Sequence, residues 1–122
     1  MSKHYSSGAD LSAKTLRGVN ILADNVASTL GPRGRTVLLQ RAGRRPFVSK
    51  DGVTVAEHVV LDDPIENAAV QILKQASSQT NALAGDGTTT SMVLARAILR
   101  EAQKHVVAGV APIQVKRALD RA

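Results

Sequence analysis

The stretch "ALAGDGTTTSMVLARAIL", residues 82–99, places a Gly-Asp-Gly turn and three threonines directly before an apolar run with helical spacing. This spacing predicts an amphipathic helix that begins at Thr88. The first turn of a helix has unpaired N–H groups and a partial positive charge, so it suits an anion, phosphate above all. Glycines at positions 85 and 87 would let the backbone approach that anion closely.

Asp86 allows two interpretations of the same turn. A carboxylate beside a phosphate is repelled unless a divalent cation lies between them, and a carboxylate, magnesium, phosphate and a helix N-terminus form a consistent set. Alternatively, Asp86 or one of the threonines caps the helix and the other residues only form the turn. The spacing matches neither a Walker loop nor a Rossmann fingerprint, so both interpretations stay open at this point.

The rest of the chain predicts a mainly helical fold with one small β-hairpin. Two β-prone runs, "TVLLQ" (36–40) and "PFVS" (46–49), flank a loop of five residues, whereas "TVAEHVVL" (54–61) is ambiguous between a helical turn and a strand. Long helices are expected over residues 9–30, 62–83 and 88–108, with a last helix from Pro112. Their expected buried stripes are Leu16, Val19, Ala23, Val26 and Leu30, then Ile65, Ala69, Ile72, Ala76 and Leu83, then Val93, Leu94, Ile98, Ala102 and Val106.

Composition narrows the class of protein. A chain of 122 residues with 43% hydrophobic residues fits one small domain, and it argues against disorder. Only 2% of the residues are aromatic, which leaves almost no stacking platforms for nucleic acid bases. The sequence has no cysteine, no apolar run long enough to span a membrane and no apolar signal core. We therefore expect a cytoplasmic protein that does not associate with a membrane.

The net charge of +6 is concentrated in one segment. No acidic residue lies between Asp24 and Asp51, and the basic residues there are Arg33, Arg35, Arg41, Arg44, Arg45 and Lys50. This segment could attract phosphate, nucleic acid or an acidic partner, or it could be the solvated surface of a hairpin.

Three motifs taken together resemble one family. "TLGPRGR" (29–35), "KDGVTVA" (50–56) and "AGDGTTT" (84–90), in this order and at these separations, are similar to the N-terminal equatorial segment of the group I, GroEL-type chaperonins. "LRGVNILAD" (16–24) and "VVAGVAPIQVKRALDRA" (106–122) extend the resemblance over nearly the whole chain.

The resemblance implies an ATP and magnesium site. It assigns nucleotide contacts to Thr29, Leu30, Gly31 and Pro32, a place by the phosphates to Lys50, a catalytic role in hydrolysis to Asp51, magnesium to Asp86, and phosphate contacts to Gly87, Thr88, Thr89 and Thr90. Arg33 stands where the family usually has lysine, and this change keeps the charge. From the residues alone, Lys50 could equally be a solvated lysine, Asp51 a helix cap and Pro32 a helix breaker.

The resemblance also implies that residues 1–122 form a partial equatorial domain without the intermediate and apical domains. Those domains would bind unfolded client proteins and a co-chaperonin, the complete protein would form a homo-oligomeric ring, and the main catalytic aspartate of the family would lie outside this chain. We therefore expect nucleotide binding without efficient hydrolysis, and uncovered apolar helix faces that favour self-association or partial order.

Two other classes of function remain open. A phosphate or nucleic-acid binder would use the basic segment 33–50 and would lose affinity steeply with salt, but the shortage of aromatic residues makes nucleic acid an unlikely partner. A truncated, non-hydrolysing assembly or regulatory module would pair with a full chaperonin ring through the hairpin and through a strand formed by "MSKHYSS" (1–7).

Overall fold

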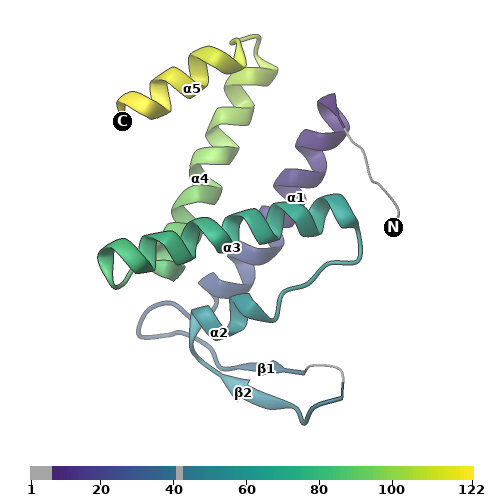
Figure 1. Cartoon of the computed structure of the whole chain (residues 1–122), viewed down its shortest axis with the longest axis vertical. Coiled ribbons are helices and arrows are strands. Elements are labelled where there is room, and N and C mark those ends of the chain that lie inside the picture. The colour runs from purple at the N-terminus through teal and green to yellow at the C-terminus, as the bar shows by residue number, and fades with distance from the viewer. Residues whose placement is uncertain (1–6, 41–42) are drawn as a thin grey trace.

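The computed structural model describes residues 7–40 and 43–122 of the chain. Within this part the elements are α1 Gly8–Ala27, β1 Val37–Leu39, β2 Phe47–Ser49, α2 Gly52–Glu57, α3 Pro64–Ala84, α4 Thr88–Val107 and α5 Pro112–Arg121 (Figure 1). The predicted fold class, mainly helical with one small hairpin, is confirmed. Residues 1–6 of the expected N-terminal strand, and Arg41 of the basic segment, lie outside the described residues.

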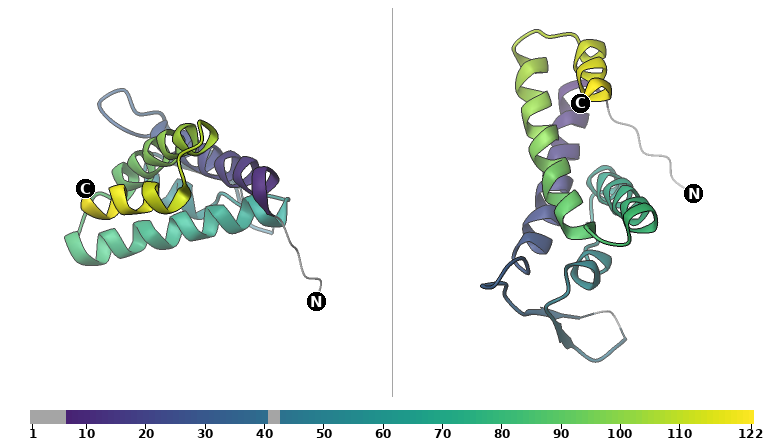
Figure 2. Two further views of the ribbon diagram at one scale, coloured as in Figure 1. Left: turned by 90° about the horizontal axis from the view of Figure 1, so that it is seen from above. Right: turned by 90° about the vertical axis from the view of Figure 1, so that its left-hand side faces the viewer.

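The two long helices α1 and α4 lie side by side, and α3 crosses both of them (Figures 1 and 2). The core forms where the three helices meet and also takes in α2. Its buried residues are Val19, Leu22, Val26, Ala56, Val70, Leu73 and Met92. Aliphatic side chains fill this core, as the composition predicts.

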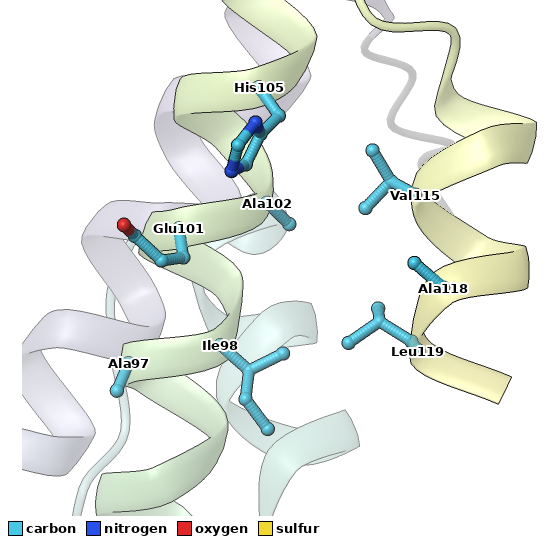
Figure 3. Close-up of a pocket in the computed structure, with 8 residues that line it drawn as sticks. All are labelled: Ala97, Ile98, Glu101, Ala102, His105, Val115, Ala118 and Leu119. Atoms are coloured by element: carbon cyan, nitrogen blue, oxygen red, sulfur yellow. The ribbon is translucent and has the colours of Figure 1, made fainter. Parts of the chain in front are cut away.

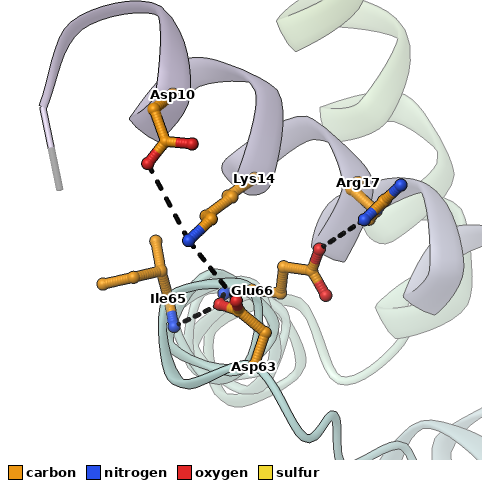
Figure 4. Close-up of polar contacts among 6 residues, drawn as sticks. All are labelled: Asp10, Lys14, Arg17, Asp63, Ile65 and Glu66. Carbon is orange, nitrogen blue, oxygen red and sulfur yellow. Dashed lines mark hydrogen bonds and ion pairs between the residues drawn. The ribbon is translucent and has the colours of Figure 1, made fainter. Parts of the chain in front are cut away.

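α1 and α3 cross at very short range because Gly18 has no side chain. A Cβ atom at Gly18 would lie 2.5 Å from the backbone oxygen of Glu66. Ion pairs flank this crossing: Lys14 lies 3.4 Å from Asp63, and Arg17 lies 3.2 Å from Glu66 (Figure 4). Asp63 also caps α3, because its Oδ1 accepts hydrogen bonds from the amides of Ile65 and Glu66.

The predicted stripe of α1 is largely confirmed. Val19, Ala23 and Val26 are buried, but Leu30 is 42% exposed because the helix ends at Ala27, before that residue. The end is fixed locally, since the hydroxyl of Thr29 donates to the carbonyl of Val26 and tightens the last turn.

The predicted stripes of α3 and α4 are partly wrong. On α3 the buried face is displaced by roughly a quarter turn: Val70, Leu73 and Ser77 are buried, whereas Ile72 is 68% and Leu83 90% exposed. On α4, Met92 faces the core, while the expected Leu94 and Ile98 are 58% and 40% exposed. Each helix carries apolar residues on more than one face, and the periodicity alone does not indicate which face the neighbours cover.

The hairpin and the flanking short elements agree with the sequence. β1 and β2 pair antiparallel with Val37 opposite Ser49 and Leu39 opposite Phe47. Of the ambiguous segment 54–61, residues 54–57 are helical and belong to α2, whereas residues 58–61 are neither helix nor strand. α5 lies against α4 and has no buried residue. In the part of the chain that the structure describes, no helix is long and apolar enough to cross a membrane.

Candidate functional site

Gly52 marks the point where three segments of the chain meet. A Cβ atom at Gly52 would lie 2.2 Å from Oγ1 of Thr89 and 3.1 Å from Oγ1 of Thr29. The end of α1, the start of α2 and the start of α4 therefore touch one another. The three motifs, separated by 14 and 27 residues along the sequence, form one polar surface at this end of the molecule.

The first of these segments is a closed loop after α1. The amide of Arg35 donates to the carbonyl of Ser28 at 2.7 Å, so the chain returns to its starting point over residues 28–35. Gly31 has a φ of +76°, a conformation that favours glycine. A Cβ atom at Gly34 would lie 2.2 Å from the carbonyl oxygen of Thr29, so glycine is also required there. Thr29 is buried, whereas Leu30, Gly31 and Pro32 are exposed.

The second segment is the start of α2, where Asp51 is the N-cap. Its Oδ2 accepts hydrogen bonds from the amide of Thr54 at 3.3 Å and from the Thr54 hydroxyl at 2.8 Å. The hydroxyl of Thr54 is the main cause that holds the pKa of Asp51 below its ordinary value. The capping role that the sequence left open for Asp51 is therefore observed. Lys50 lies directly before it and is exposed.

The third segment is the turn between α3 and α4. Gly85, with a φ of +74°, ends α3, and Gly87, with a φ of +86°, is the N-cap of α4. Asp86 accepts a hydrogen bond from the amide of Gly87 at 2.7 Å, one residue before the first helical turn. A glycine cap has no side chain, and within the described part of the chain no side chain accepts from the amides of residues 88–90. The first turn of α4 is therefore open to an external acceptor.

This open turn is also accessible and firmly held. Apart from Gly87 itself and its two chain neighbours, no atom of the described residues lies within 4 Å of the position that a Cβ atom would take at Gly87. Below the turn, the Ser91 hydroxyl donates to the carbonyl of Thr88 at 2.7 Å, so the buried Ser77 must donate its own proton to Ser91, at 3.1 Å. This pair of hydroxyls fixes the start of α4 to α3.

Among the described residues, no group of three or more His, Cys, Asp or Glu side chains could hold a metal ion. Asp86 is exposed, and one of its oxygens accepts from the neighbouring amide of Gly87, so it could supply one ligand to a cation whose other ligands come from elsewhere. Magnesium typically binds one or two carboxylates together with phosphate oxygens and water.

An apolar groove lies away from this polar end, although exposed apolar side chains such as Leu30 and Leu83 also lie in or beside the motif segments. One open groove of about 420 Å³ runs between α4 and α5, and Ile98, Ala102, Val115 and Leu119 are among its lining side chains (Figure 3). Glu101 and His105 also line the groove, but most of its lining side chains are apolar (Figure 3). The groove therefore has the chemistry of an uncovered helix face and not that of a phosphate site.

The structure thus brings most of the predicted site residues to one end of the fold. Thr29, Asp51 and Thr89 lie around Gly52, while Lys50, Asp86 and Gly87 lie in the adjoining turns. Sequence reasoning assigned no role to Gly52, although a glycine directly after a capping aspartate is a signal of close approach. It also missed Ser77, for which a serine within a helical pattern gives no signal.

Comparison with known proteins identifies the family of this chain. A model of the TCP-1/cpn60 chaperonin family matches residues 22–122. The crystal structure of a group III chaperonin in the open state superposes with a TM-score of 0.78 and 28% sequence identity over 92% of this chain. The chain spans 22% of the length of that protein. The chain belongs to the TCP-1/cpn60 chaperonin family.

Proposed function

We propose that this chain is the ATP- and magnesium-binding equatorial part of a protein-folding chaperonin of the group I type. The observation that carries the proposal is the meeting of Thr29, Gly52 and Thr89, which joins the three motifs into one surface. Family membership adds support, because the matched region includes all three motifs.

The groups at this surface fit a nucleotide with magnesium. The uncapped first turn of α4 offers backbone N–H donors, and the threonines add hydroxyl donors, which together suit phosphate. The carboxylate of Asp86 suits a magnesium ion that the phosphates also ligate. In this proposal, Gly87, Thr88, Thr89 and Thr90 hold the phosphates with Lys50 beside them, and Thr29, Leu30, Gly31 and Pro32 line the nucleotide.

In a complete chaperonin ring, the binding of ATP and the hydrolysis of its phosphoanhydride bond would drive the domain movements. Asp51 is suited to a limited part in that reaction. Its lowered pKa keeps the carboxylate ionised at neutral pH but makes it a weak proton acceptor, because general bases work best with a pKa near the working pH. Asp51 would therefore orient a water molecule or a cation, and efficient hydrolysis would need a further group.

The same proposal includes a location in the cytoplasm, which rests on the absence of cysteine and of an apolar signal core. It also includes a homo-oligomeric ring, unfolded client proteins and a co-chaperonin, which rest on the resemblance of the motifs to group I chaperonins.

A second function, assembly without ATP turnover, is favoured by a separate observation. Large apolar residues on α3 and α4 face outward, among them Ile72, Leu83 and Leu94. A helix face of this kind is typical of a surface that another segment or subunit covers. Mixed assembly with a full-length chaperonin in size-exclusion chromatography would support this function.

The experiment that tests the main proposal is a calorimetric titration with a slowly hydrolysed ATP analogue, with and without magnesium. We expect binding to the wild-type protein that depends on magnesium and that Asp86→Ala abolishes. Asp62→Ala is the matched control, because this exposed aspartate lies before α3, at the end opposite Gly85. Absence of binding in a protein shown to be folded would contradict the proposal, as would equal affinity in the Asp86→Ala variant.

A further inference from the structure

Lys74 on α3 reaches the carboxyl end of α2. Its Nζ donates to the carbonyl of Val59 at 2.8 Å and lies 3.4 Å from the carbonyl of Glu57. The carbonyl of Glu57 belongs to the last residue of α2, and the carbonyl of Val59 lies two residues beyond it. The ammonium group therefore lies at and just past the carboxyl end of the helix, which carries partial negative charge and where a cation is stabilising. The side chain is half-buried, and this burial lowers the pKa of Lys74 while the charge of Glu57 opposes the change.

The other end of α2 lies in the candidate site. α2 has six residues, so only about 9 Å of helix separates its two ends. A helix this short is not stable alone, and its position depends on the contacts that its neighbours make with it. Asp51 and Gly52 at its start therefore move together with the carbonyls that Lys74 holds.

The same side of α3 holds neighbouring parts of the fold as well. Asn67, seven residues before Lys74 and thus on the same helix face, accepts a hydrogen bond from the amide of Leu61 at 3.0 Å. Ser77, one turn after Lys74, bonds to Ser91 at the start of α4. α3 thus fixes the segment that follows α2 and the first turn of α4 from one surface.

We infer that Lys74 is a positioning residue of the nucleotide site, which fixes Asp51 and Gly52 beside Thr89 by holding the carboxyl end of α2. This inference rests on the proposed function. Lys74 acts through α2, because the contacts of its ammonium group are with carbonyls at the far end of that helix from the site.

The test compares Lys74→Met, which removes the charge at similar length, with Lys74→Arg, which keeps a cationic donor. Lys104→Met is the control, because Lys104 is an exposed lysine on α4. Two quantities are measured: affinity for the magnesium complex of the ATP analogue, and hydrogen exchange of the Thr54 amide, which reports the Asp51 cap.

We expect Lys74→Met to weaken binding on the order of tenfold, as loss of an outer positioning contact typically does. The Thr54 amide should exchange faster while amides in the middle of α1 and α4 keep their protection. Lys74→Arg should restore much of both properties, and Lys104→Met should change neither.

Wild-type affinity in Lys74→Met would overturn the inference. Faster exchange throughout α1, α3 and α4 would overturn it too, because that result means a general loss of stability. If the wild-type protein binds no nucleotide, the proposed function fails. If the Thr54 amide exchanges at the same rate in Lys74→Met as in the wild type, Lys74 does not position α2, and the inference fails independently of the proposed function.

Discussion

The two ends of this molecule differ in how tightly their side chains are packed. At the polar end, the motif segments contact each other directly, and Thr29 and Thr89 lie so close to Gly52 that no Cβ atom fits there without a shift. At the opposite end, α5 has no buried residue and the groove beside α4 is lined by apolar side chains. Contacts within this chain therefore fix the geometry of the candidate site. The apolar end instead resembles a surface that another segment or subunit covers.

Gly52→Ala, at the polar end, is expected to have the largest effect on stability and nucleotide binding. The added Cβ atom would lie 2.2 Å from Oγ1 and 3.1 Å from Cγ2 of Thr89, so either the Thr89 side chain must rotate or α2 and α4 must move apart. We expect a loss of about 1–3 kcal/mol in the free energy of unfolding, together with loss of nucleotide binding in calorimetry.

Two controls sharpen this result. The double variant Gly52→Ala with Thr89→Ala removes the colliding hydroxyl and should regain part of the stability. Gly18→Ala, which meets the Glu66 backbone at 2.5 Å, should destabilise the fold but leave nucleotide affinity per folded molecule unchanged. Wild-type stability in the Gly52→Ala variant would refute the close contact.

A medium effect is expected from the cap of α2 and its pH dependence. The pKa of Asp51 is lowered in the fold, so its contribution to stability is complete above its ordinary pKa of 3.8 and is lost as the pH falls through the lowered value. Asp51→Ala should cost about 1 kcal/mol at pH 7.

Urea unfolding at a series of pH values measures this effect. The difference between wild type and Asp51→Ala should shrink toward zero in strong acid. A difference that stays constant down to the lowest pH at which both proteins fold would show that the carboxylate does not cap α2.

The smallest effect on stability is expected at the apolar end. Ile72 is 68% exposed, so Ile72→Lys should change the free energy of unfolding by less than about 0.5 kcal/mol. Sedimentation velocity should instead show less self-association than in the wild type. Leu22→Ala, in the buried core, is the contrasting control and should cost about 2–5 kcal/mol. A large loss of stability in Ile72→Lys would mean that this face is covered.

Much of the architecture could be predicted from the sequence because local signals mark it. Pro64 and Asp63 start α3, Gly85 ends it, and the β-prone runs on either side of residues 41–45 form the hairpin. Local signals did not determine which apolar face each helix buries. Ile72 and Val70 are equally apolar, and only the crossing of α3 over α1 decides that Val70 is inside.

The candidate site was predictable in part for the same reason. Asp86, Gly87 and Thr89 lie together in the sequence, so their shared turn could be expected. Their contact with Thr29 follows from the packing of α1 against α4, which no local pattern contains, and only the resemblance to a family joined the motifs. Lys74 was missed because a lysine at a half-buried helical position resembles any surface lysine.

The proposed function requires that the three motif segments form one nucleotide site. The most direct measurement is NMR of the protein with an ATP analogue, with manganese in place of magnesium, because the paramagnetic ion broadens the amide signals near it. If the three segments form one site, the amide signals of Gly31, Gly52 and Thr89 should all broaden strongly, and that of Val115 on α5 should not. Broadening confined to the basic hairpin, or to one of the three segments alone, would contradict it.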